Sequence, residues 1–209
     1  GNEEAVRRVA ADYPEIAFVF ASALGPVEPN VSVFADVLYE LAYLLGLIAG
    51  GMTESGTIGV VASLPVPEEN KIINAFVAGA KEVNPDGKVV VMFINSWFDP
   101  AAAKEAALAQ VDAGVDVLYA ERFGVIEAAV ENDLWAFGHQ GDQNELGPDH
   151  VLTSTVWDFL PCVEYVVSQV NAGVYRPCYF SNNNPAFPRR GSLAPYHGND
   201  KDIPQEILD

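Results

Sequence analysis

Aromatic and charged side chains follow two apolar runs that read as strands of a parallel sheet. Trp97 and Phe98 come after the first of these runs, and Glu121, Arg122 and Phe123 come after the next. Since parallel strands present their carboxyl ends at one edge of a sheet, these side chains are expected to lie close together. Aromatic faces stack on flat heteroaromatic rings, while charged and amide groups bind the polar edge of such rings. The pattern therefore favours a small-molecule binding cleft.

Three further residues belong to the same predicted edge. Gln140 and Asp142 follow the run WAFGH, and Trp157 lies within VLTSTVWD. Taken singly, these candidates have simpler explanations. Trp97 and Trp157 could pack at a rim, Glu121 and Arg122 could form a solvated ion pair, and Asp142 could end a turn. Asp99, which follows Phe98, could cap the next helix. Their joint occurrence on one edge favours ligand binding over these explanations.

Motifs for catalysis or metal binding do not occur in the sequence. The three histidines, His139, His150 and His197, show no HExxH spacing, and there is no CxxC pair. A GxSxG elbow, a GxxxxGK[ST] phosphate loop and a strand–GxGxxG–helix unit are also missing. We therefore expect no catalytic residues, no metal site and no cofactor.

Composition narrows the class of partner. The chain has 209 residues, half of them hydrophobic, and a formal net charge of −18, so it is a folded protein that repels nucleic acid and anionic membrane surfaces. Its most apolar run, Leu41–Met52, is too short to span a bilayer. Cys162 and Cys178 are compatible with one disulfide or with two thiols.

Strand-like and helix-like runs alternate along most of the chain, which is typical of an α/β fold with parallel strands covered by helices. We expect helices at 2–12, 34–52, 70–83, 100–113, 124–133 and 161–172, and strands at 15–22, 57–63, 88–95, 115–121, 134–140 and 151–158. Asp99 and Pro100 fit the cap and first position of the helix that follows Trp97. From Gly173 onward the sequence reads as loop.

A glycine-rich break near Gly51–Gly56 suggests a boundary between lobes. We expect a partial N-terminal lobe at 1–55, a second α/β lobe at 56–157, and a crossover helix with a loop-rich tail at 158–209. The first region offers one convincing strand, EIAFVF, which is too little sheet to be stable alone. The first lobe is therefore expected to be incomplete.

Several longer segments resemble the basic membrane protein family of ABC-importer substrate-binding proteins, which is related to purine nucleoside receptors. The similarity runs from Tyr43 to Tyr119, including INSWFDP, and continues through WAFGHQGDQ, VLTSTVWD and LAPYH. The resemblance implies a type I periplasmic binding protein with two α/β lobes and a purine nucleoside or nucleobase in the cleft between them. It also implies an extracytoplasmic location, an ABC permease as partner, and peripheral membrane attachment through an N-terminal lipid anchor outside this chain.

Residue roles can be carried over from the family at three positions. Trp97 matches the family's motif Trp on the cleft side of the second lobe, and Asp142 matches an acidic residue of a GxxSDQ-like loop. Trp157 stands where nucleoside receptors have a ribose-binding Lys, which favours a base such as adenine. The segment AERFGV departs from the family pattern QHTDS, so Glu121, Arg122 and Phe123 are expected to modify specificity.

The resemblance also implies that the family's first strand and its ligand-binding loop precede Gly1, so that the chain alone is expected to bind ligand weakly. A metabolite-sensing regulatory module with the same fold is the alternative to transport. An enzyme of flavodoxin-like or hydrolase type is a third possibility, which the lack of a nucleophile or metal motif disfavours.

Overall fold

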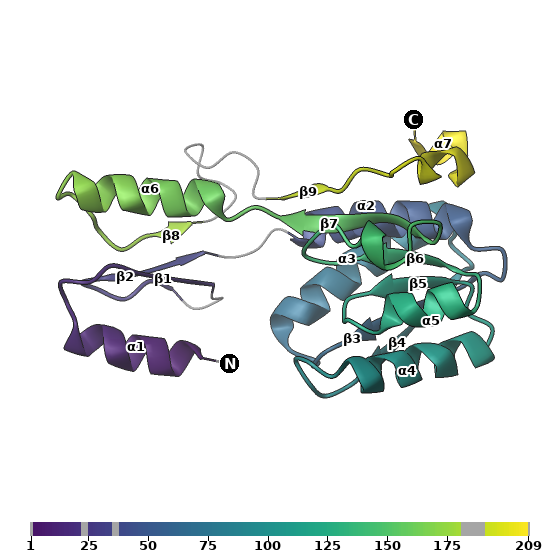
Figure 1. Ribbon diagram of the computed structural model, residues 1–209, viewed down its shortest axis with the longest axis horizontal. Helices are drawn as coiled ribbons and strands as arrows, with labels where there is room; N and C mark the ends of the chain where they lie inside the picture. The colour runs from purple at the N-terminus through teal and green to yellow at the C-terminus, as the bar shows by residue number, and fades with distance from the viewer. Residues whose placement is uncertain (1, 22–24, 35–37, 181–190, 209) are drawn as a thin grey trace. The chain divides into compact units, whose positions relative to one another are not determined.

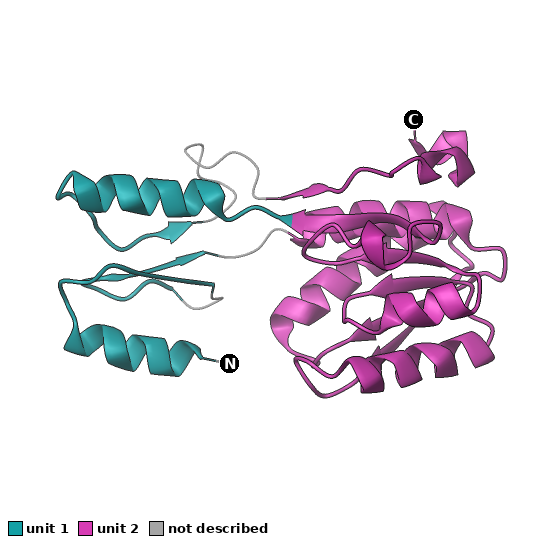
Figure 2. Cartoon of the chain, viewed as in Figure 1, with its two compact units in different colours: residues 1–37, 157–190 teal, residues 38–156, 191–209 magenta. Residues whose placement is uncertain are grey.

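The computed structural model describes residues 2–21, 25–34, 38–180 and 191–208, and the chain divides into two compact units. Unit 1 contains residues 1–37 and 157–190, and unit 2 contains residues 38–156 and 191–209 (Figure 2). Each unit therefore includes segments from both halves of the sequence.

Unit 2 is an α/β unit built on a six-stranded sheet. Its main elements are α2 (Leu38–Met52), β3 (Thr57–Ala62), α3 (Pro67–Val83), β4 (Lys88–Phe93), α4 (Pro100–Asp112), β5 (Val117–Ala120), α5 (Val125–Glu131), β6 (Trp135–Gly138), β7 (Val151–Trp157), β9 (Gly191–Leu193) and α7 (Gln205–Leu208). Short 3₁₀ helices occupy Asn144–Leu146 and Asn199–Asp202. The strand order is β4-β3-β5-β6-β7-β9, and the pairs from β4 to β7 are parallel (Figure 1).

Helices cover both faces of this sheet, as the alternation of side chains along β5 shows. Leu118 and Ala120 belong to an apolar cluster formed with α4 and α5. Tyr119 points to the other face, where its ring stacks on Phe76 of α3 with 4.9 Å between centroids. This arrangement confirms the predicted α/β fold and places the carboxyl ends of the parallel strands at one edge.

Close backbone contact between α2 and α3 attaches α2 to unit 2. A Cβ atom added to Gly46 of α2 would lie 2.1 Å from the carbonyl oxygen of Phe76. A Cβ atom added to Gly79 of α3 would lie 2.1 Å from the carbonyl oxygen of Tyr43. Any side chain at either position would force the two helices apart, so these glycines allow the helices to pack.

The two units differ from the predicted regions 1–55, 56–157 and 158–209. Because α2 packs on α3, the first division falls between residues 37 and 38, before α2 and not after it. The chain then passes from unit 2 to unit 1 at Trp157 and returns to unit 2 at Gly191. The expected C-terminal region is therefore shared between both units.

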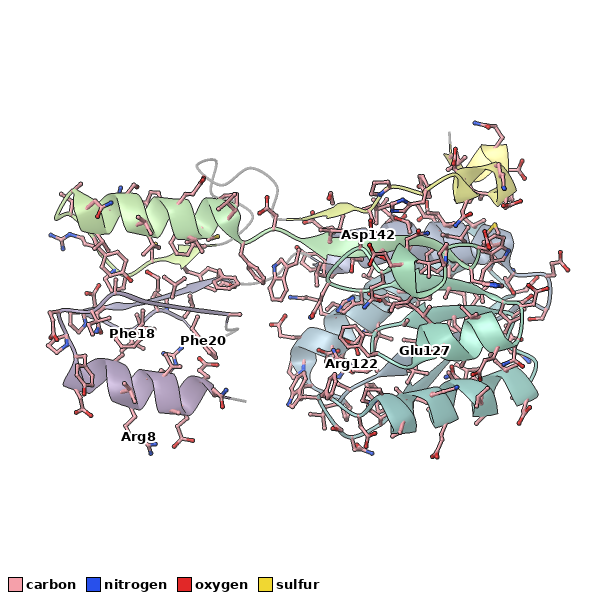
Figure 3. The ribbon with its side chains drawn as sticks, viewed as in Figure 1. Arg8, Phe18, Phe20, Arg122, Glu127 and Asp142 are labelled. Carbon is pink, nitrogen blue, oxygen red and sulfur yellow. The ribbon has the colours of Figure 1, made fainter. Side chains whose placement is uncertain are left out.

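Unit 1 contains α1 (Glu3–Asp12), β1 (Phe18–Ala21), β2 (Val31–Phe34), α6 (Leu160–Asn171) and β8 (Tyr179–Phe180). Its three strands are parallel, in the order β1-β2-β8 (Figure 1). The buried side-chain nitrogen of Asn30 lies 2.8–3.0 Å from the carbonyl oxygens of Ala10, Tyr13 and Ile16, and so holds the end of α1 against the start of β2. Figure 3 labels Phe18 and Phe20 on β1.

The sequence predicted most elements of unit 2, and its errors lie mainly in unit 1 and the tail. The helix expected from residue 34 is preceded by strand β2, whose alternating valines favour a strand. The short strands β8 and β9 lie in the segment predicted as loop. Ser22 of the predicted strand 15–22 and positions 35–37 of the predicted helix lie outside the described residues.

The prediction that strand 88–95 is covered on both faces is wrong. Its counterpart β4 alternates between exposed and half-buried residues along its length. It is the edge strand of the sheet and pairs only with β3 among the described strands. Because successive side chains of a strand point to opposite faces of the sheet, the alternation shows that one face of β4 is less covered than the other.

We predict that Gly46→Ala destabilises the chain even though alanine favours helices. The added methyl group meets the fixed backbone of α3, and overpacking of this kind costs about 1–3 kcal/mol. Gly51→Ala, in the same helix, is the control, since its methyl group meets only the flexible side chain of Ile207. Urea unfolding of both variants tests the prediction. Equal free energies of unfolding for the two variants would contradict it.

Candidate functional site

The carboxyl ends of β4, β5 and β6 carry most of the residues predicted to bind ligand. Trp97 and Phe98 lie between β4 and α4, Glu121 to Phe123 lie between β5 and α5, and Gln140 and Asp142 follow β6. Figure 3 shows Arg122 on the β5–α5 turn and Asp142 on the loop after β6. We call this set of loops the ligand edge of unit 2.

Backbone geometry sets the direction of the loop that carries the aromatic residues. Asn95 has φ of 56°, a left-handed conformation that asparagine tolerates better than most residues, and the chain turns there at the end of β4. The Asp99 side chain then accepts a hydrogen bond from the backbone N–H of Ala102 at 3.0 Å, and Pro100 is the first residue of α4. The predicted cap is therefore confirmed, and Trp97 and Phe98 lie in a short segment fixed at both ends.

Three aromatic side chains form an exposed rim on the ligand edge. Trp97 is 48% exposed, Phe98 is 71% exposed and Phe123 is 53% exposed. The Phe98 and Phe123 rings meet edge to face, with centroids 6.2 Å apart. Gly124, with φ of 105°, makes this contact possible because a Cβ atom there would lie 2.1 Å from the carbonyl oxygen of Pro100. The rim offers flat apolar surface for stacking.

A buried ion pair between neighbouring residues lies behind this rim. The Glu121 carboxylate accepts hydrogen bonds from Arg122 Nε at 2.7 Å and from Arg122 Nη2. It also accepts a hydrogen bond from the backbone N–H of Ser63 at 3.1 Å. Arg122 Nη1 donates to the carbonyl oxygen of Trp97 at 3.0 Å, and the guanidinium carbon lies 5.9 Å from the Trp97 ring centroid. The pair thus joins the ends of β3, β4 and β5.

Burial of this pair excludes the solvated-pair explanation considered from the sequence. Glu121 is only 3% exposed, and both of its carboxylate oxygens accept hydrogen bonds from protein groups. In this arrangement Glu121 positions Arg122. Arg122 in turn holds the Trp97 loop, so ligand contact through Glu121 would be indirect.

His139 is a buried residue at the end of β6 that the sequence prediction did not include. Its Nδ1 atom is hydrogen-bonded to the Tyr119 hydroxyl at 2.7 Å and lies 3.2 Å from Thr155 Oγ1. Its Nε2 atom lies 3.5 Å from Glu121 Oε1. Burial, aided by the positive charge of Arg122, lowers the pKa of His139 to about 3. The imidazole is therefore neutral at physiological pH.

Glu69 is a second buried residue that the sequence did not indicate. It lies in the first turn of α3, with Oε2 at 3.7 Å from Arg122 Nη2. Burial, a hydrogen bond with Glu121 and the negative charge of Glu121 raise the pKa of Glu69 to about 8. At neutral pH the cluster of Glu69, Glu121, Arg122 and His139 therefore holds one negative and one positive charge.

His139 and Glu69 differ in how far the sequence could have indicated their position. His139 follows β6 directly, as Glu121 follows β5, so its position at a strand end is a usable signal. Glu69 sits beside Glu68 at a helix start, where acidic residues ordinarily face solvent. Nothing local in the sequence distinguishes it.

A pocket of about 370 Å³ opens beside the aromatic rim. Its lining includes Phe123, His139, Gln140, Asp142, Gln143 and Glu145. This volume lies within the range of small-molecule sites. The pocket combines one aromatic wall with amide, imidazole and carboxylate groups, and so brings three of the predicted residues together.

Asp142 is held by two contacts that the sequence did not reveal. Its Oδ1 atom accepts a hydrogen bond from the backbone N–H of Asn144 at 3.2 Å, which fits the turn role considered for this residue. Its Oδ2 atom lies 2.8 Å from Nε2 of His197, in the C-terminal segment. The C-terminal segment therefore helps to hold the loop that carries Asp142.

The structure assigns Trp157 to unit 1, whereas the sequence predicted it on the second lobe. It is the last residue of β7 and belongs to unit 1. There it packs against Phe34, with centroids 6.1 Å apart, and against Phe159 at 4.1 Å. Trp157 ends a strand that is parallel to β6, at the residue where the chain leaves unit 2, and its role in ligand binding stays a prediction.

Within residues 2–21, 25–34, 38–180 and 191–208, no group of three or more His, Cys, Asp and Glu side chains could hold a metal ion. In the same part of the chain, no helix has both the length and the apolar character to cross a membrane.

Comparison with known proteins identifies the family. The family model described as ABC transporter substrate-binding protein, PnrA-like, matches residues 1–175. The chain belongs to this family. Its members are substrate-binding proteins and not enzymes, as predicted, and substrate-binding proteins of ABC transporters are generally extracytoplasmic. The resemblance to the basic membrane protein family and the periplasmic-binding-protein-like fold are both confirmed.

Individual relatives carry different names. A Haloferax volcanii protein named as an ABC transporter glucose-binding protein is 37% identical over 161 residues, 76% of this chain and 41% of the relative. A purine-binding protein from Brucella abortus is 36% identical over 156 residues, 74% of this chain and 44% of the relative. The solved structure of a transcriptional activator of the comK gene from Bacillus halodurans has a TM-score of 0.78 at 27% identity, covering 98% of this chain and 70% of that one. The chain spans about half the length of the curated relatives it matches.

We predict that Glu121→Gln strongly destabilises unit 2. The substitution leaves the Arg122 guanidinium buried without its main partner, and breaking a buried ion pair costs about 3–5 kcal/mol. Ionisation of Glu69, which lies 3.7 Å from Arg122, would recover part of this loss. Glu127→Gln, at an exposed residue of α5, should change stability by about 0.5 kcal/mol or less. Urea unfolding of both variants is the measurement, and equal effects would show that the pair has no special role.

Proposed function

We propose that this chain is the ligand-binding part of a solute-binding protein of an ABC importer, and that its ligand is a purine base or nucleoside. The ligand edge of unit 2 forms one wall of the binding site. The observation that carries the proposal is the aromatic rim beside a polar pocket, in a family with a relative named as a purine-binding protein.

Each part of a purine has a suitable partner on the ligand edge. The exposed face of Trp97 can stack on the bicyclic ring, and Phe123 lies at the pocket mouth. Gln140, Gln143 and Asp142 offer amide and carboxylate groups for the ring nitrogens and exocyclic groups. Among purines we favour adenine or another ligand with few sugar contacts, because Trp157 stands where nucleoside receptors carry a ribose-binding Lys.

Membership of the family supports the transport role. We propose that the protein acts outside the cytoplasm, delivers its ligand to an ABC permease, and is attached to the membrane through a lipid anchor outside these 209 residues. Since the chain spans about half the length of its curated relatives, we expect binding by this chain alone to be weak.

A metabolite-sensing regulatory module is the second candidate function. It is favoured by the structural similarity to a protein described as a transcriptional activator, with a TM-score of 0.78. The sugar name of the Haloferax volcanii relative makes glucose the competing ligand. A sensor and an importer would use the same ligand edge, so the ligand can be tested independently of this choice.

A thermal-shift screen with adenine, adenosine, guanosine and glucose tests the ligand. Ligand that binds only the folded chain stabilises it by RT ln(1 + [L]/Kd), so we expect a concentration-dependent rise in melting temperature with adenine and less or none with glucose. A rise with glucose alone would overturn the purine assignment. No rise with any purine at millimolar concentration would refute it as well.

We predict that Trp97→Ala reduces purine affinity by about 1–3 kcal/mol, the usual value of base–aromatic stacking. Calorimetric titration of the parent and the variant measures the difference. Trp135→Phe is the control, because Trp135 is the first residue of β6 and so lies at the opposite edge of the sheet from Trp97. If purine affinity is unchanged in a folded Trp97→Ala variant, Trp97 is a packing residue.

A further inference from the structure

Glu69 is a buried acid placed against an ion pair that is already complete. Its carboxyl group lies beside Glu121, and its Oε2 atom makes no hydrogen bond to another described residue. Glu121 already receives hydrogen bonds from Arg122 and Ser63. A second negative charge in this buried site would be unfavourable next to Glu121, so the geometry favours a protonated Glu69.

A continuous set of contacts connects Glu69 with the aromatic rim. Oε2 of Glu69 lies 3.7 Å from Nη2 of Arg122. Nη1 of Arg122 donates to the carbonyl oxygen of Trp97 at 3.0 Å, and its guanidinium lies 5.9 Å from the indole ring. Arg122 therefore contacts both the buried acid and the exposed indole, and a change in its position would reach both.

We propose that Glu69 is a positioning residue for Arg122. A protonated Glu69 leaves Arg122 bound to Glu121 and Trp97, whereas an ionised Glu69 draws Arg122 away from Trp97. An ionised Glu69 attracts the guanidinium and repels the Glu121 carboxylate at the same time. The bond from Arg122 to the Trp97 carbonyl is then weakened, and the indole gains freedom. The inference rests on the proposed function only in treating Trp97 as a ligand-binding residue.

The groups that face Glu69 determine the pH range of this effect. Glu121 and Arg122 face it from the β5–α5 turn, and His139 faces it from the end of β6. On its own helix, Lys71 is paired with Glu68 at 2.5 Å. His139 has a pKa of about 3 and stays neutral above it, whereas Glu69 has a pKa of about 8. Glu69 is thus the group that changes charge near pH 8.

The same raised pKa makes stability depend on pH in a defined direction. The folded chain keeps the Glu69 proton up to about pH 8, while the unfolded chain loses it near the ordinary value of 4.5. The stabilising contribution of the neutral carboxyl is therefore complete below pH 4.5 and is lost as the pH rises to about 8. Glu69→Gln should remove this decline.

Fluorescence of Trp97 tests the proposal in the 209-residue chain. Trp135→Phe and Trp157→Phe leave Trp97 as the single tryptophan. Acrylamide quenching is then measured from about pH 5 to about pH 10, a range that brackets the carboxyl titration. We expect one transition centred near pH 8, with stronger quenching at high pH. Glu69→Gln should abolish the transition, and the neighbouring Glu68→Gln should retain it.

The outcomes separate this inference from the proposed function. A transition that persists in Glu69→Gln, or a flat profile in the parent chain, would overturn the inference. If the double Trp→Phe background does not fold, ¹⁹F NMR of fluorotryptophan-labelled parent chain, with Trp97 assigned by Trp97→Phe, gives the same readout. A Trp97 transition without purine binding supports the inference and refutes the proposed function. Purine binding without the transition supports the proposed function and refutes the inference.

Discussion

The ligand edge of unit 2 depends on the buried ion pair between Glu121 and Arg122. Removing two charges from water is costly, and the cost is offset only where hydrogen bonds satisfy both groups. Here Ser63 supplies a backbone N–H to the carboxylate, and Trp97 supplies a backbone carbonyl to the guanidinium. Satisfying the pair therefore requires the loops after β3 and β4 to approach the loop after β5. The aromatic rim is positioned as a consequence of this requirement.

The charge of the cluster bears on the kind of ligand that fits beside it. The whole chain carries a net charge of −18, which would attract cations in general. Within the cluster, however, Glu69 and His139 are neutral at physiological pH, and the charges of Glu121 and Arg122 oppose each other. A locally neutral, partly apolar surface suits an uncharged aromatic ligand better than an ammonium or a phosphate group. This agrees with a purine base as the ligand.

Local sequence patterns were sufficient to predict most helices and strands of unit 2. Strand and helix periodicity predicted the α/β fold, and the strand-end rule brought the Trp97, Arg122 and Asp142 loops to one edge. Trp157 also ends a parallel strand, but its assignment to unit 1 was missed because the path of the chain between units is not encoded in any short segment. Glu69 was missed for a related reason. Its burial results from the packing of α3 over β5, and its local sequence is that of an ordinary solvent-facing helix start.

We propose that the carboxyl edge of the unit 2 sheet binds a purine. The most direct measurement is ¹H–¹⁵N NMR of the chain titrated with adenine to millimolar concentration, which detects weak binding and locates it. We expect the shifts to concentrate in the Trp97 indole N–H and in the backbone amides of Phe123, Gln140 and Asp142. Shifts centred instead on the pocket at the opposite edge, lined by Glu54, Asp116 and Trp135, would contradict this assignment of the site. An unchanged spectrum would contradict it equally.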